Sequence, residues 1–189
     1  MKLNKRFFED DTIEVAKEIL GCYLVHESDE GRTVGKIVET EAYLENDPAS
    51  HSFKGKTRRN EVMFGEGGKA YVYFTYGMYH CFNVVTNKKN KGEAVLIRAL
   101  EPIDGIEIMK KRRKVEEIKN LCSGPGKLVI SMGIKKEHNG LDLLNGKLRL
   151  KKKDNDKLDI AEAKRIGIVK GTHLPYRFYI KENEYISRK

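Results

Sequence analysis

Two glutamates and a tyrosine alternate in the segment VETEAYL at residues 38–44. An ionised carboxylate that faces a pocket can bind a water molecule and take a proton from it, which is how many hydrolases activate their nucleophile. Taken alone, the pattern favours an ordinary solvent-exposed strand face, because most glutamates are exposed. If residues 37–44 form a strand, one face carries Ile37, Glu39, Glu41 and Tyr43 and the other carries Val38, Thr40, Ala42 and Leu44.

Two polar side chains interrupt otherwise apolar segments further along the chain. Arg98 lies within AVLIRAL at 94–100, and Asn83 lies within CFNVV at 81–85. A charge or an amide in a buried strand must find polar partners, because burying it unpaired costs free energy. Together with Glu41 these residues can line a polar pocket, where a nearby arginine keeps the carboxylate ionised. A purely structural buried ion pair explains the same residues equally well.

Aromatic residues are concentrated between positions 71 and 82. On alternating strands some of these rings must point away from the core. Exposed rings beside a basic loop suit stacking on nucleic-acid bases, at about 1–3 kcal/mol per stack, or filling the gap that an extruded base leaves. A tyrosine-rich β core is the alternative, and the segment alone does not separate the two. The residues concerned are Tyr71, Tyr73, Phe74, Tyr76, Tyr79 and Phe82.

The balance of charge favours a polyanionic partner. Lys and Arg number 37 against 28 Asp and Glu, which gives a formal net charge of +9. The polar stretch 46–69 is predicted to be a basic surface loop, since no acid lies between residues 48 and 60. Its unopposed cations are Lys54, Lys56, Arg58 and Arg59.

The sequence carries no motif for a cofactor or a metal. GPGK at 124–127 lacks the first glycine and the Ser or Thr of a nucleotide-binding P-loop, although its backbone amides can contact a phosphate. The 3 cysteines and 5 histidines have neither C-x-x-C nor metal-ligand spacing, so neither a disulfide framework nor a zinc site is predicted. Without a secretory or membrane-spanning segment, a cytoplasmic setting is expected, with nucleoid association in a bacterium.

The elements expected to hold these residues mix helix and strand without a βαβ rhythm. Asp11 and Glu14 form a predicted capping box for a helix that Gly21 ends, and Asp104 with Glu107 forms another. This pattern is typical of an α+β fold, in one domain that spans residues 1–189. The helix opened by Asp104 and Glu107 is expected to run into the basic stretch 110–114. Further helices are expected after 123–126 and after the predicted cap Asp159, and strands at 22–27, 33–44, 70–76, 79–86, 94–100 and 176–180.

Several long segments together resemble the alkyladenine (3-methyladenine, methylpurine) DNA glycosylase family. The resemblance covers nearly the whole chain and implies a mixed α+β domain with a curved antiparallel sheet, a protruding β-hairpin and surrounding helices. It also implies a monofunctional enzyme without a cofactor, whose partner is double-stranded DNA that contains damaged purines. A monomer is expected because base flipping requires no symmetry. The segments are VETEAYL (38–44), HS (51–52), RRNEVMF (58–64), YVYFTYGMYHCFN (71–83), VLIRALEP (95–102), CSGPGKL (122–128) and YRFYI (176–180).

The resemblance also implies a role for individual residues. Glu41 would be the general base that deprotonates water, and Arg98, with a backbone carbonyl in RIGI at 165–168, would help to hold that water. Tyr43, His51 and Tyr73 would enclose the flipped base, and Asn83 would exclude guanine by crowding its 2-amino group. Tyr76 would wedge into the base stack. Contacts with the DNA backbone are expected from Arg58, Arg59 and Lys127.

The predicted function is excision of alkylated or deaminated purines, namely 3-methyladenine, 7-methylguanine, hypoxanthine and ethenoadenine, in base excision repair. A catalytically idle nucleic-acid-binding module is the first alternative, since charge and exposed tyrosines would suffice for it. A sugar or nucleotide hydrolase with one carboxylate base is the second, although no second well-placed acid supports it.

Overall fold

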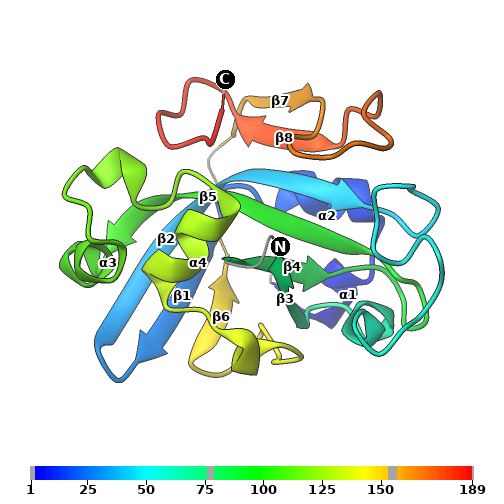
Figure 1. Cartoon of the computed structure of the whole chain (residues 1–189), viewed down its shortest axis with the longest axis horizontal. Coiled ribbons are helices and arrows are strands. Elements are labelled where there is room, and N and C mark those ends of the chain that lie inside the picture. The colour runs from blue at the N-terminus through cyan, green and yellow to red at the C-terminus, as the bar shows by residue number, and fades with distance from the viewer. Residues whose placement is uncertain (1–2, 76–78, 153–156, 189) are drawn as a thin grey trace.

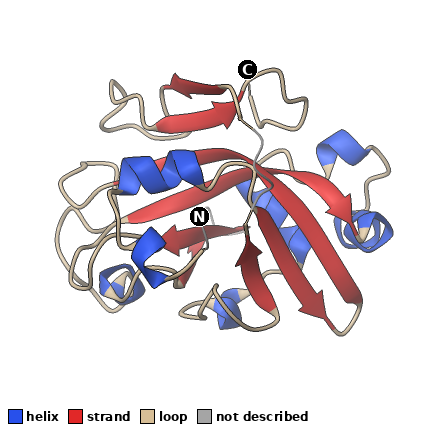
Figure 2. Cartoon of the chain, turned by 180° about the vertical axis from the view of Figure 1, so that it is seen from behind, coloured by secondary structure: helices blue, strands red, loops and turns tan. Residues whose placement is uncertain are grey.

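The computed structural model describes residues 3–75, 79–152 and 157–188. Within them a curved antiparallel sheet carries helices on its two faces, which confirms the predicted α+β class (Figures 1 and 2). The strands are β1 (Tyr23–Ser28), β2 (Gly31–Tyr43), β3 (Ala70–Thr75), β4 (Tyr79–Val85), β5 (Ala94–Asp104), β6 (Leu148–Lys151), β7 (Ile160–Ala163) and β8 (Arg177–Ile180). The helices are α1 (Lys5–Phe8), α2 (Thr12–Glu18), α3 (Ile106–Arg113) and α4 (Pro125–Met132), with short 3-10 helices at Glu61–Phe64, Ile118–Asn120 and Lys136–His138.

The long strand β2 has two different neighbours along one edge. Its first half pairs with β1, over Gly31 to Lys36, and its second half pairs with β8, over Glu39 to Glu41. The opposite edge of β2 pairs with β5 over most of its length, from Val34 to Tyr43. The segment with both glutamates therefore lies inside the sheet, between β5 and β8. The side chains of Glu39, Thr40 and Glu41 are also fully buried.

A β-bulge interrupts the alternation of β2 at the start of this segment. The pairing with β5 shifts register between Ile37 and Glu39 and again between Glu39 and Thr40. Ile37 consequently packs in the main core with Ala42, while Val38 packs in a small cluster with Ile186. The strict two-face prediction is wrong for residues 37 and 38, because a bulge inserts one residue and reverses the faces beyond it.

Helices α2 and α4 lie over opposite faces of the sheet, as the two views from opposite sides show (Figures 1 and 2). Thr40 of β2 faces α2, where its hydroxyl donates to the Ala16 carbonyl at 2.8 Å. Both Glu39 and Glu41 lie within hydrogen-bond or ion-pair distance of Arg98 instead. The main core is apolar; its largest fully buried side chains include Phe8, Ile19, Leu20, Phe82, Leu100 and Met109.

The two predicted capping boxes have different outcomes. Asp11 caps α2, because its Oδ1 accepts from the backbone N–H groups of Ile13 (2.9 Å) and Glu14 (3.2 Å). Asp104 does not cap α3: β5 continues to Asp104, whose carboxylate binds Arg32 at 2.6 Å. Gly105, with φ of 72°, turns the chain into α3, since a left-handed residue is needed there.

The helix predicted after Asp159 is wrong. Residues Ile160–Ala163 form strand β7, which pairs with β8, and Asp159 makes an exposed ion pair with Lys181 at 2.8 Å. The free edge of β8 offers backbone hydrogen bonds that a local capping preference cannot outweigh. Strand β6 and helix α1 were not predicted from the sequence. None of the helices in the described residues is long and apolar enough to cross a membrane.

Candidate active site

One cavity of about 580 Å³ lies where β3, β4, β5 and the end of β2 meet the loop that carries residues 166–170. Its volume is in the range of small-molecule binding pockets. Five residues selected from the sequence line it together: Tyr43, His51, Tyr73, Asn83 and Arg98. Their positions are up to 55 residues apart in the chain, so the curvature of the sheet brings them to one place.

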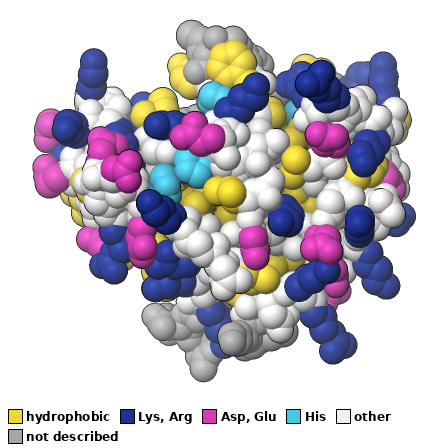
Figure 3. All heavy atoms as spheres, turned by 90° about the horizontal axis from the view of Figure 1, so that it is seen from below, with side chains coloured by type: hydrophobic (Ala, Val, Ile, Leu, Met, Phe, Trp, Pro, Cys, Tyr) yellow, Lys and Arg dark blue, Asp and Glu magenta, His cyan; other side chains and the backbone are white. Residues whose placement is uncertain are grey.

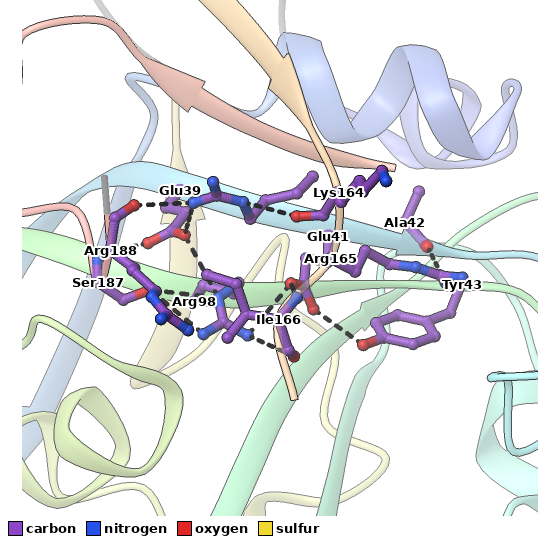
Figure 4. Close-up of polar contacts among 11 residues, drawn as sticks. Glu39, Glu41, Ala42, Tyr43, Arg98, Lys164, Arg165, Ile166, Ser187 and Arg188 are labelled. Atoms are coloured by element: carbon purple, nitrogen blue, oxygen red, sulfur yellow. Dashed lines mark hydrogen bonds and ion pairs between the residues drawn. The ribbon is translucent and has the colours of Figure 1, made fainter. Parts of the chain in front are cut away.

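Glu41 lies directly behind this lining, with no exposed surface of its own. Its Oε1 accepts from the backbone N–H of Ile166 at 2.8 Å and lies 3.2 Å from Arg98 Nη1. Its Oε2 accepts from the Tyr43 hydroxyl at 2.8 Å (Figure 4). All three partners line the cavity, and an oxygen of a carboxylate can accept two hydrogen bonds, so Oε2 has capacity for a further donor.

The protonation of Glu41 is set by opposing influences. Burial raises the pKa of Glu41 above that of an ordinary glutamate, because a carboxylate loses hydration there. Arg98, the Ile166 N–H and the Tyr43 hydroxyl act against this rise, since each stabilises the ionised form. A raised pKa with specific charged and hydrogen-bonding neighbours is typical of a general base.

Glu39 is equally buried, but its partners lie on the other side of Arg98 (Figure 4). Its Oε1 lies 2.9 Å from Arg177 Nη1 and 3.4 Å from Arg98 Nε. Its Oε2 accepts from the Ser187 backbone N–H at 2.6 Å. Arg177, Ser187 and Glu39 do not line the cavity, so Glu39 serves to hold Arg98 in place.

The aromatic side of the cavity is built from three rings in contact. His51 and Tyr73 are 4.4 Å apart between centroids in an edge-to-face arrangement. His51 Nδ1 lies 3.0 Å from the Tyr71 hydroxyl, which fixes the imidazole, and the ring centroids of Tyr71 and Tyr73 are 5.3 Å apart. Desolvation and nearby Arg59 lower the pKa of His51, which favours a neutral ring.

Other predicted site residues lie around this cavity or outside the described chain. Asn83 is buried, and its Nδ2 donates to the Tyr71 carbonyl at 3.0 Å.

The residues predicted to contact the DNA backbone lie outside the cavity lining. Arg58 and Arg59 are exposed, and Arg59 Nη2 donates to the Phe74 carbonyl at 3.1 Å, which joins the basic loop to β3. Lys127 donates to Ser123 Oγ at 3.2 Å. The predicted wedge, Tyr76, lies outside the described residues.

Positive charge is not gathered into one patch on the face shown in Figure 3, where Lys and Arg side chains alternate with Asp and Glu. Two arginines of the basic stretch at 110–114 are engaged in the fold: Arg112 binds Glu30, and Arg113 donates to the Leu121 carbonyl at 3.3 Å. Among the described residues, no three His, Cys, Asp or Glu side chains are grouped as a metal site would require.

Sequence reasoning missed the residues that support the site from distant parts of the chain. Arg165 forms a buried ion pair with Asp47, and Ser187 binds both Glu39 and Arg98. In this part of the chain the sequence indicates only the stretch 165–168, for a backbone carbonyl near the water. The Ile166 carbonyl does accept from Arg98 Nη1, at 3.4 Å, while the Ile166 N–H binds Glu41. An arginine 118 positions from its partner gives no local signal.

Comparison with known proteins gives a consistent result. The family model described as methylpurine-DNA glycosylase (MPG) matches residues 6–184. A protein of Carboxydothermus hydrogenoformans, provisionally named a 3-methyladenine DNA glycosylase, is 52% identical over 191 residues, which cover 100% of both chains. Proteins with the same provisional name are 48% identical in Methanoculleus marisnigri (100% of both chains) and 46% identical in Clostridium acetobutylicum (99% of this chain, 98% of the relative).

Proposed function

This chain belongs to the methylpurine-DNA glycosylase family and is a DNA N-glycosyl hydrolase of base excision repair, and from that premise we propose that it flips a damaged purine into the cavity between Tyr43, His51 and Tyr73. The substrates are alkylated or deaminated purines: 3-methyladenine, 7-methylguanine, hypoxanthine and ethenoadenine. The observation that carries the proposal is a buried carboxylate, Glu41, whose three hydrogen-bond and ion-pair partners all line one aromatic cavity.

In the proposed reaction, Glu41 takes a proton from a water molecule held with the help of Arg98. The water oxygen bonds to C1′ of the deoxyribose, the bond from C1′ to the base nitrogen breaks, and its electron pair leaves with the base. Since the sugar develops positive charge before the bond to water forms, buried Glu41 also stabilises the transition state electrostatically. The water must enter between the lining residues to reach Glu41. There it can donate a hydrogen bond to Oε2, which already accepts one from the Tyr43 hydroxyl.

The nature of the leaving base divides the substrates into two groups. A cationic base such as 3-methyladenine or 7-methylguanine leaves without further protonation. A neutral base such as hypoxanthine or ethenoadenine must gain a proton as it leaves. Glu41 serves as the base, and no carboxylate is among the described residues that line the cavity to act as an acid and protonate the leaving base. Excision of the cationic group is therefore expected to be faster at neutral pH.

Binding of the flipped base is proposed to depend on ring stacking and on exclusion. Tyr43, His51 and Tyr73 supply aromatic faces, each stack contributing about 1–3 kcal/mol. Asn83, fixed through its amide on the Tyr71 carbonyl, would crowd the 2-amino group of guanine. Tyr76 would fill the gap in the duplex, and Arg58, Arg59 and Lys127 would contact phosphates. The enzyme is proposed to act as a monomer.

An abasic-site assay tests this function. The protein is incubated with duplexes that carry one hypoxanthine, one ethenoadenine or methylated purines, and alkali-labile sites are counted beside an undamaged duplex. We expect abasic sites only in the damaged duplexes. Salt-sensitive binding without abasic sites would instead support a catalytically idle binding module. The complete burial of Glu41 would then explain why no base is released.

A further inference from the structure

Another buried ion pair, Arg165–Asp47, adjoins the site but takes no part in the proposed reaction. Arg165 and Asp47 come from loops on different sides of the cavity, and both side chains are almost completely buried. Both guanidinium Nη atoms bind the carboxylate, with Nη2 to Asp47 Oδ1 at 2.9 Å. Such two-point pairing fixes the orientation of both groups.

The Asp47 end of the pair holds the loop that leads to His51. Asp47 Oδ1 also accepts from the Ala49 N–H at 3.0 Å, and the Asp47 carbonyl accepts from the Ser50 N–H at 2.8 Å. Ala49 and His51 both line the cavity. Asp47 therefore fixes the turn that supplies one wall of the cavity.

The Arg165 end of the pair contacts the strand that carries Glu41. Arg165 Nη1 donates at 3.0 Å to the carbonyl of Ala42, the residue between Glu41 and Tyr43 (Figure 4). The guanidinium carbon lies 4.7 Å from the centroid of the Tyr43 ring, within cation–π range. Nη2 donates to the Gly171 carbonyl at 3.4 Å, so the same side chain also links two positions of the loop that carries it.

The residue after Arg165 binds Glu41 directly. The Ile166 N–H donates to Glu41 Oε1 at 2.8 Å, and Ile166 is joined to Arg165 by a peptide bond. Two of the three partners of Glu41 thus adjoin Arg165: Tyr43 through the contact with its ring and Ile166 through the chain. Arg98, the third partner, is held by Glu39 and Ser187 instead.

Stability alone is a weak explanation for this pair. A buried ion pair gains little over well-packed apolar side chains, because desolvation offsets the attraction between the charges. In addition, Arg165 Nε is buried without a hydrogen-bond partner among the described residues, which is an added cost. The pair is better explained by the geometry that it imposes on its neighbours.

We propose that the Arg165–Asp47 pair is a positioning device that joins the two walls of the cavity and holds Tyr43 and the Ile166 N–H on the carboxylate of Glu41. This inference rests on the proposed function of Glu41 as the base. Since both hydrogen bonds favour the ionised carboxylate, loosening the pair raises the pKa of Glu41 further, and less of the base is ionised at a given pH.

Three variants test the proposal. Arg165→Lys keeps the charge but cannot reach Asp47, Ala42 and Gly171 at once, and Asp47→Asn keeps the shape but removes one charge. The double variant Asp47→Ala/Arg165→Met removes both charges, so it leaves no uncompensated buried ion if a single variant fails to fold. Arg112→Met is the matched control, because Arg112 is another largely buried arginine that bridges Glu30 and the Ser131 carbonyl, away from the cavity.

Two measurements are made on every folded variant. The first is the pH dependence of the single-turnover rate of base release, and the second is a carbon-13 NMR titration of the Glu41 carboxyl, assigned by its loss in Glu41→Gln. We expect both midpoints to move to higher pH in the Arg165 and Asp47 variants, with about a tenfold lower rate on the acid side for each pH unit of movement. Arg112→Met should lose stability and keep both midpoints.

The outcomes separate this inference from the proposed function. Unchanged midpoints in folded Arg165 and Asp47 variants, or an equal movement in Arg112→Met, overturn the positioning role even if the wild type is active. If the wild type releases no base but the Glu41 titration moves to higher pH in the Arg165 and Asp47 variants, the positioning role is supported and the glycosylase reaction at this site is refuted.

Discussion

The carboxylate of Glu41 accepts a hydrogen bond at 2.8 Å from the backbone N–H of Ile166, a residue 125 positions later in the chain. This contact joins the centre of the sheet to the loop that forms the opposite wall of the cavity. Tyr43 and Arg98 complete the environment of Glu41, and each is held by a different buried ion-pair network: Tyr43 by Arg165 with Asp47, and Arg98 by Glu39 with Arg177.

The two adjacent carboxylates should differ in what their replacement abolishes. Glu41→Gln should leave binding of lesion DNA near the wild-type level but slow base release at least about a hundredfold, because the general base is lost. Glu39→Gln should lower the free energy of unfolding by about 3 kcal/mol, since Arg177 and Arg98 lose their shared counter-charge. Single-turnover rates and urea denaturation of both variants check this. Near-normal excision by Glu41→Gln would refute its role as the base.

The pH dependence of excision should report the protonation of Glu41. Because the base must be ionised and burial raises its pKa, the rate should rise with pH through a midpoint above that of an ordinary glutamate. Tyr43→Phe removes one hydrogen bond to the ionised form, so its midpoint should lie at still higher pH. Rates measured from acid to neutral pH test the sign; a midpoint that moves to lower pH would contradict it.

Replacement of Asn83 should change which bases are released. In Asn83→Ser a shorter side chain leaves room for the 2-amino group of guanine, and the bond to the Tyr71 carbonyl is lost. Release of guanine should increase by about tenfold or more over the wild type, as expected when a steric exclusion is removed. Chromatography of bases freed from undamaged DNA measures this. If Asn83→Ser releases no more guanine than the wild type, Asn83 has no excluding role.

Gly105, rather than the predicted cap Asp104, should control the junction of β5 and α3. A Cβ at Gly105 would lie 2.2 Å from the Arg32 carbonyl oxygen, and φ is +72°. Gly105→Ala should therefore lower the free energy of unfolding by more than about 2 kcal/mol. Gly140→Ala is the control, since φ is +87° but nothing lies within 4 Å, and it should cost about 1 kcal/mol. Equal losses in urea denaturation would show that the contact is unimportant.

Much of the fold could be predicted because its signals are local. The Asp11 cap, the strands around Glu41 and Asn83 and the mixed α+β class follow from residue types and spacing within a few positions. The errors arose where a tertiary partner was decisive. Asp159 is followed by strand β7 and not by a helix, because β8 has a free edge beside it, and the bulge at Glu39 reverses the faces of Ile37 and Val38.

For the site, the sequence by itself determined which side chains are available: a carboxylate beside a tyrosine, an arginine and an amide inside apolar strands, and a cluster of rings. It could not determine how deeply Glu41 is buried, which partners hold it, or that Arg165 and Asp47 join the two walls. Those properties depend on pairs separated by 118 and 125 positions. Burial, which raises the pKa of Glu41, and the Ile166 N–H, which acts against that rise, both arise only in the folded chain. Desolvation and hydrogen bonding act over a few ångströms in space, so only the tertiary structure fixes them.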